Sequence, residues 1–298
     1  MIPPSRFKPP PRRVFPGVAG ALGCVLVAWL TMAAVYEPPG RPAPSDLTDS
    51  QPVLGSDPAR AVLYQGRGIK LVSDGKLEPA LDQFRRAAAF DPSNLSVLIN
   101  IAYVLDKLGR YEEAIVQLKE AEKIDPRNSM VFLNWGNSLI NMKKFEEALG
   151  PLQKAADLDP SNQLVYVDLG AALNNLGRYP EAAGKFEKAV ELDPKNVVSI
   201  FNLATIWSKA GETTKAIQKY ERVIELDPKN LTAYYNCAAL HEKAGNLDGA
   251  IETIRRAIKV DPDNGTLREI LSRLLVAKAS QLPTIKTPPK SPEQEPAH

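Results

Sequence analysis

The sequence has few residues of the kinds that build reactive centres. Among 298 residues there are two cysteines, Cys24 and Cys237, and two histidines, His241 and His298. So few thiols and imidazoles nearly exclude disulfide frameworks, metal clusters and histidine-based catalytic triads. Glycine-rich phosphate loops and nucleophile elbows are also missing. We therefore expect no catalytic residue, no metal site and no cofactor, and we interpret His241 and Cys237 as packing residues of a helix.

The sequence also has no large excess of charge of one sign. It carries 37 Lys and Arg against 35 Asp and Glu, a net charge of +2. A nucleic-acid-binding protein usually presents a basic face, so this balance argues against such a partner. A hydrophobic fraction of 44% is normal for a chain that buries a core, which excludes general disorder.

One long hydrophobic run stands near the amino terminus. Residues 17–36 contain no charged side chain, and four basic residues precede them, Arg6, Lys8, Arg12 and Arg13. About 20 apolar residues in a helix span the roughly 30 Å hydrocarbon layer of a membrane. By the positive-inside tendency, residues 1–16 stay cytoplasmic and the rest of the chain crosses. This predicts a single-pass signal-anchor helix whose body faces the far side, most simply the periplasm of a bacterial inner membrane.

Two alternatives for this segment remain open. Thr31-Met32-Ala33 is compatible with a signal-peptidase site, so the segment would be removed and the protein exported. In the second alternative, Cys24 is the lipidated cysteine of a bacterial lipoprotein, although the residues before it match the lipoprotein box poorly. The proline-rich residues 37–60 are expected to form a tether that holds the body off the membrane. Residues 281–298 are expected to form a disordered proline-rich tail.

The middle of the chain repeats with a period of 34 residues. The dipeptide Asp-Pro recurs at this interval six times, at 91–92, 125–126, 159–160, 193–194, 227–228 and 261–262. In phase with it, the units are 61–94, 95–128, 129–162, 163–196, 197–230 and 231–264. A fixed period of this length indicates a repeat architecture.

Each unit has the pattern of a helical hairpin. In unit 163–196, one helical stripe is made by Tyr166, Leu169, Gly170 and Leu173, and a second by Ala182, Phe186 and Ala189. Gly177 breaks the first helix and Pro194 ends the second. The pattern resembles the tetratricopeptide repeat (TPR) family, which implies an all-α, right-handed superhelical solenoid of six helix hairpins. Residues 265–280 are expected to form its C-terminal capping helix.

The resemblance implies that the first helix of each pair lines a concave face. At its sixth place the six units carry Gly66, Asn100, Asn134, Asp168, Asn202 and Asn236. An asparagine amide both donates and accepts, so it can pair with a peptide group in both directions. The row resembles the asparagine ladder in the TPR region of O-linked N-acetylglucosamine transferase, although Gly66 and Asp168 depart from it. The other interpretation is that asparagine here only braces adjacent helices.

Aromatic and further polar residues are predicted to accompany this row. The fifth places form an apolar stripe that includes Ile99, Leu133, Val167, Phe201 and Tyr235, and the predicted binding set also contains Tyr103, Asn137, Asn141 and Asn174. The other interpretation of the stripe is packing between repeats. The second and fifth places hold no Lys or Arg, which argues against the clamp that some TPR co-chaperones use for a carboxylate.

Together these patterns predict a non-enzymatic scaffold. Its partner is expected to be a protein or extended peptide held in the concave groove, with the membrane contacted through residues 17–36. No small-molecule substrate and no nucleic acid are expected. The alternatives are a stable accessory subunit that docks on an enzyme or secretion machine through its convex face or cap, and an exported soluble TPR protein.

Overall fold

The computed structural model describes residues 57–281, and within this range every regular element is a helix. The predicted anchor 17–36, most of the tether and the tail lie outside the described residues. By contacts between Cα atoms the chain divides into two units, Met1–Pro126 and Arg127–His298. The first contains α2 (Pro58–Ser73), α3 (Leu77–Phe90), α4 (Leu95–Lys107) and α5 (Tyr111–Ile124). We call them unit 1 and unit 2 and describe each by itself.

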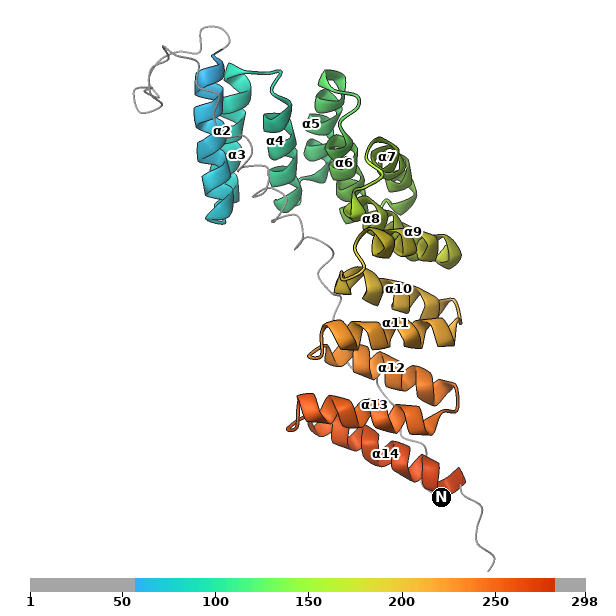
Figure 1. Ribbon diagram of the computed structural model, residues 1–298. Helices are drawn as coiled ribbons and strands as arrows, with labels where there is room; N and C mark the ends of the chain where they lie inside the picture. The colour runs from blue at the N-terminus through green and yellow to red at the C-terminus, as the bar shows by residue number, and fades with distance from the viewer. Residues whose placement is uncertain (1–56, 282–298) are drawn as a thin grey trace, which may run out of the picture. The chain divides into compact units, whose positions relative to one another are not determined.

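Unit 2 contains nine of the described helices, which follow one another in chain order in Figure 1. They are α6 (Ser129–Asn141), α7 (Phe145–Leu158), α8 (Gln163–Asn175), α9 (Tyr179–Leu192), α10 (Val197–Lys209), α11 (Thr213–Leu226), α12 (Leu231–Lys243), α13 (Leu247–Val260) and α14 (Gly265–Gln281). Each helix packs on the next in chain order, and α6 also contacts α8. Hairpins therefore stack through both of their helices, as the 34-residue period predicts, and the all-α repeat fold is confirmed.

The last residue of each repeat starts the following helix. Asn162 accepts a hydrogen bond from the backbone N–H of Leu164, and Asn196 does the same for Ser199. The preceding aspartate fixes the turn, since Asp193 Oδ1 accepts from the N–H of Lys195. These are N-caps and Asx turns, which satisfy donors that a helix start leaves unpaired. The first repeat differs, because Asp57 caps α2 and the helix begins at Pro58 rather than at residue 61.

The turn inside each hairpin uses a residue with positive φ. Glycine fills this place in five hairpins, for example Gly177 with φ 75° and Gly211 with φ 83°. In the α6–α7 hairpin the place belongs to Lys143, with φ 61°. A left-handed backbone costs a residue with a Cβ about 1–2 kcal/mol, so this turn is the strained one of the described series.

The core of each hairpin is a contact between a small and a large residue. An added Cβ at Gly170 would lie 2.8 Å from ring atom Cε2 of Phe186, and Gly68 has the same relation to Phe84. Both aromatic side chains are buried. The first helix therefore approaches the second closely, and its remaining faces are left to contact neighbouring hairpins or solvent.

The membrane prediction concerns residues 17–36, which lie outside the described range. Between residues 57 and 281, none of the helices is long and apolar enough to cross a membrane.

Candidate peptide-binding surface

The sixth-place residues lie on the first helices of successive hairpins. In unit 2, Asn134 lies on α6, Asp168 on α8, Asn202 on α10 and Asn236 on α12. Asn100 lies on α4 of unit 1 and is half-buried. The fold thus places one such residue in each hairpin of unit 2 that α6 to α13 form.

Three of these residues, Asn134, Asn202 and Asn236, form what we call the asparagine row. All three are half-buried. Asn134 Nδ2 donates to the carbonyl of Met130 at 2.9 Å, and Asn236 Nδ2 donates to Tyr220 Oη at 3.2 Å. Asn202 makes no side-chain hydrogen bond within the described part of the chain. Two amides therefore brace the fold through their nitrogen atoms while their oxygen atoms remain available as acceptors.

Asp168 is placed differently from what the sequence pattern predicts. Its side chain is 3% exposed, and it is hydrogen-bonded to the side chain of Asn137 on α6. Burial raises the pKa of Asp168 to about 7, and the hydrogen bond with Asn137 opposes this rise. Asp168 and Asn137 therefore join two neighbouring first helices, and the open surface that we expected for Asp168 is not there.

Two of the predicted aromatic residues, Phe201 and Tyr235, lie on α10 and α12 of unit 2. The ring of Phe201 packs edge-to-face on that of Tyr220, with centroids 5.4 Å apart. Tyr235 Oη contacts Asn264 Oδ1 at 3.5 Å. Phe201 and Tyr235 are half-buried, whereas the fifth-place residues Leu133 and Val167 are buried. The apolar stripe expected along the first helices is interrupted there, because these two aliphatic side chains are buried.

The remaining predicted residues are spread over both units. In unit 2, Asn174 Oδ1 accepts a hydrogen bond from Lys209 Nζ at 2.7 Å, and Asn141 is exposed near the end of α6. In unit 1, Lys107 Nζ lies 5.3 Å from the ring centroid of Tyr103. Burial, and secondarily Asp106, raise the pKa of the Tyr103 phenol.

Tyr220 is the contributor that the sequence pattern missed. It lies on the second helix α11, yet its hydroxyl reaches both Asn236 Nδ2 and Thr205 Oγ1, the latter at 3.0 Å. The large residue at this place is Phe84, Phe186 or an aliphatic in the other repeats. A tyrosine with a polar tip at a core place was the available signal, since a buried phenol needs a hydrogen-bond partner.

The asparagine row and its aromatic neighbours offer acceptor atoms and ring faces. Within residues 57–281, the asparagine row has no titratable neighbour hydrogen-bonded to it other than Tyr220. Amide oxygen atoms spaced one per hairpin suit the backbone N–H groups of an extended chain, and half-exposed rings suit its apolar side chains.

Profiles described as tetratricopeptide repeat match residues 71–132, 133–197, 185–218 and 208–274. Among curated proteins, none matches this sequence.

Several solved structures share the fold. YrrB, described as a TPR protein with an unusual peptide-binding site, is 24% identical with a TM-score of 0.54, over 66% of this chain and 97% of YrrB. The Pseudomonas aeruginosa protein pilF is 23% identical with a TM-score of 0.59, over 72% of this chain and 97% of pilF. MamA from Desulfovibrio magneticus RS-1, solved from residue 41 to its end, is 23% identical with a TM-score of 0.53, over 57% of this chain and 97% of the solved MamA chain. Since the family profiles together span residues 71–274, more than half of the chain, this protein belongs to the tetratricopeptide repeat family.

Proposed function

We propose that this protein is a non-enzymatic scaffold that binds an extended segment of a partner protein along the first helices of its hairpins. The observation that carries the proposal is the asparagine row, in which Asn202 has no side-chain hydrogen bond within the described residues and Asn134 and Asn236 keep an acceptor oxygen. The amide atoms of the row that have no protein partner are not buried, so they are open to a ligand. A bound peptide backbone would supply the missing hydrogen bonds.

The surroundings of the row support a peptide rather than a small molecule. Phe201 and Tyr235 lie one place before Asn202 and Asn236, so each of these two hairpins carries an aromatic residue next to the amide in sequence. Backbone hydrogen bonds give affinity that tolerates sequence, and aromatic contacts add preference for some side chains. The fold similarity to YrrB, whose description mentions a peptide-binding site, is consistent with such a role.

Replacing the asparagines by alanine tests this proposal. The test variant changes Asn100, Asn134, Asn202 and Asn236, and the control variant changes four amides of second helices, Gln83, Gln117, Gln153 and Gln218. Partners are first captured from source-cell membranes with the full chain, and overlapping peptides of a captured partner are then titrated by calorimetry. At about 1 kcal/mol per lost hydrogen bond, we expect binding at least about 100-fold weaker in the test variant.

The control variant and the melting curve decide how this result is interpreted. Equal helicity and melting of the two variants, with affinity lost only in the first, place the partner on the first-helix face. Undiminished affinity in the asparagine variant would contradict the proposal.

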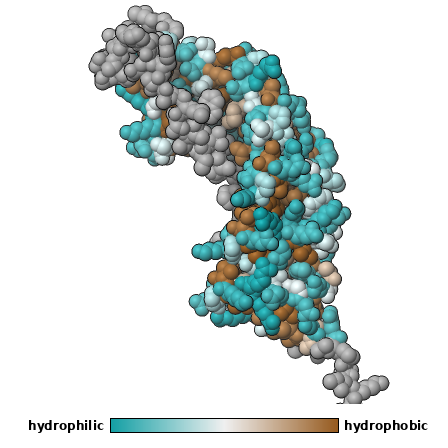
Figure 2. All heavy atoms as spheres, viewed as in Figure 1, coloured by the Kyte–Doolittle hydropathy of each residue, from teal (hydrophilic) through white to brown (hydrophobic). Residues whose placement is uncertain are grey.

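A second candidate, a stable accessory subunit, is favoured by one observation at the cap. On α14, Leu275 is 41% exposed and Val276 is 70% exposed, and hydrophobic side chains reach the surface in this region (Figure 2). Exposed apolar residues at the end of a solenoid suit a permanent interface. A partner that survives the asparagine variant but is lost from a Leu275→Ser, Val276→Ser variant would establish this function instead.

We further propose that residues 17–36 anchor the protein in a membrane with its amino end in the cytoplasm. The support is the charge-free run and the basic residues before it. We expect the full chain to stay in the membrane pellet after alkaline carbonate extraction, and the chain from residue 55 onward to be released. Protease added to the far side should remove the repeats. Full release of the intact chain by carbonate would refute the anchor, and a shortened mature chain would indicate signal cleavage.

A further inference from the structure

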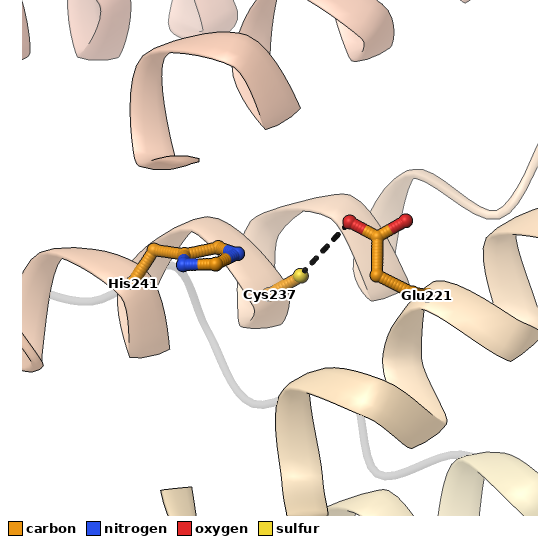
Figure 3. Close-up of side chains that lie close together, drawn as sticks. All are labelled: Glu221, Cys237 and His241. Carbon is orange, nitrogen blue, oxygen red and sulfur yellow. Dashed lines mark hydrogen bonds between the residues drawn. The ribbon is translucent and has the colours of Figure 1, made fainter. Parts of the chain in front are cut away.

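Three side chains that the proposed binding surface does not use converge in unit 2. They are Glu221 on α11 and Cys237 and His241 on α12 (Figure 3). Their ligand atoms all lie within 4.8 Å of one another, and Cys237 Sγ lies 3.6 Å from Glu221 Oε1. Cys237 is buried, whereas Glu221 and His241 are half-buried, so the cluster is reached from the side of the carboxylate and the imidazole.

The cysteine and the histidine break the repeat pattern together. Their places hold Leu169 and Leu173 in one repeat and Leu203 and Trp207 in the next. In the last repeat both become side chains that bind transition metals. Because they are four residues apart on one helix, they lie on the same face one turn apart.

Helix α13, which packs on α12, leaves room for the imidazole of His241. A Cβ added to Gly249 would lie 2.7 Å from His241 Nδ1 and 2.9 Å from its Cε1. The same place holds Glu147, Glu181 and Lys215 in the three preceding repeats. A packed helix surface tolerates such a gap only where a neighbouring side chain fills it, so glycine here accommodates the histidine.

Groups outside the cluster hold two of the three side chains in position. Arg256 Nη1 donates to Glu221 Oε2 at 2.8 Å and to Oε1 at 3.1 Å. Asn246 Nδ2 lies 3.2 Å from His241 Nδ1, so the other ring nitrogen faces Cys237 (Figure 3). Metal-ligating histidines and carboxylates are typically held in this way by outer partners that fix their orientation.

We propose that Glu221, Cys237 and His241 bind a Zn²⁺ ion that ties α11 to α12. A tetrahedral zinc site with ordinary bond lengths places its ligand atoms about 3.5 Å apart, which the cysteine and the glutamate already satisfy. Binding exchanges the thiol proton, which is released to solvent, for a zinc–thiolate bond. The thiolate and the carboxylate balance the charge of the ion, Arg256 remains on the second carboxylate oxygen, and water completes the fourth position.

Without the metal, the same residues have a plain packing role. The Cys237 thiol donates to Glu221 Oε1, and burial, followed by the nearby Glu221, raises the pKa of this thiol to about 12. A purely packing role and a zinc site therefore differ in one measurable respect, the formation of a thiolate bond to a metal.

Cobalt(II) is the probe for this bond, because it replaces zinc and its thiolate complexes absorb in the near ultraviolet. The full chain is titrated with Co²⁺ and then with Zn²⁺. We expect one Co²⁺ per chain with a thiolate-to-cobalt charge-transfer band that Zn²⁺ removes. Zn²⁺ should also raise the melting temperature of the C-terminal repeats, since it binds the folded state.

Three variants make the assignment specific. Cys237→Ala should abolish the charge-transfer band, and His241→Leu, which restores the residue of the earlier repeats, should weaken Zn²⁺ binding at least tenfold. Cys24→Ser removes the other cysteine and should leave both unchanged. Circular dichroism confirms that each variant is folded, and His241→Leu is expected to fold because leucine fills this place in four other repeats. Absence of stoichiometric binding, or a band that persists in Cys237→Ala, would overturn the proposal.

Discussion

Replacing Asp168 by asparagine is expected to stabilise unit 2 at pH 8 by about 4 kcal/mol. The aspartate side chain is 3% exposed, and burial raises its pKa to about 7. Above this pH the native state must hold a buried charge, which an amide of the same shape avoids. Asparagine also occupies this place in the two neighbouring repeats, at Asn134 and Asn202, so the fold accommodates it. Its amide oxygen can keep the hydrogen bond with Asn137.

The same change should remove a pH dependence of stability. The pKa of Asp168 is about 4 in the unfolded chain and about 7 in the folded protein, so the folded state binds more protons between these values. The free energy of unfolding therefore falls as pH rises from about 4 to about 7 and levels off above it. Urea unfolding followed by circular dichroism at pH 5 and pH 8 measures the difference.

A surface carboxylate provides the control for this experiment. Glu187 lies on α9 of the same repeat and is exposed, so Glu187→Gln should change stability little at either pH. Curves for wild type and Asp168→Asn that differ by the same amount at pH 5 and pH 8 would contradict the assignment of the pH dependence to Asp168.

The fold followed from local features of the sequence. The Asp-Pro period marks each boundary, Asn162 and Asn196 cap the next helices, and Gly177 turns the chain within its hairpin. Each of these acts through neighbours in the chain, so one sequence suffices to predict it. The period also aligns Lys143 with the glycines of the other turns, and the structure adds that this lysine takes the same left-handed conformation, with φ 61°.

The candidate surface was less predictable because it depends on contacts between hairpins. The helical period places Asp168 and Asn202 at the same sixth place, yet one is buried against Asn137 and the other is half-exposed. Likewise Glu221 lies 16 residues from Cys237 and on another helix, so no spacing rule brings them together. Packing decides which side chains of neighbouring helices come into contact. A single sequence does not encode these contacts in a simple pattern.

Replacing Gly170 by alanine should destabilise unit 2 by about 1–3 kcal/mol. An added Cβ would lie 2.8–2.9 Å from three ring atoms of Phe186, whose side chain is only 2% exposed and cannot move aside freely. Alanine has the higher helix propensity, so a loss of stability would come from the clash alone. Urea unfolding of the full chain measures it.

A second substitution tests that explanation. Another repeat pairs Ala102 with Leu118 at the corresponding places, so Gly170→Ala combined with Phe186→Leu should recover part of the lost stability. Gly184 on α9 has no atom within 4 Å of an added Cβ, and Gly184→Ala should instead stabilise the protein by about 0.5–1 kcal/mol. Equal effects of the alanine substitutions at Gly170 and Gly184 would show that helix propensity, rather than close contact with Phe186, determines the residue at this place.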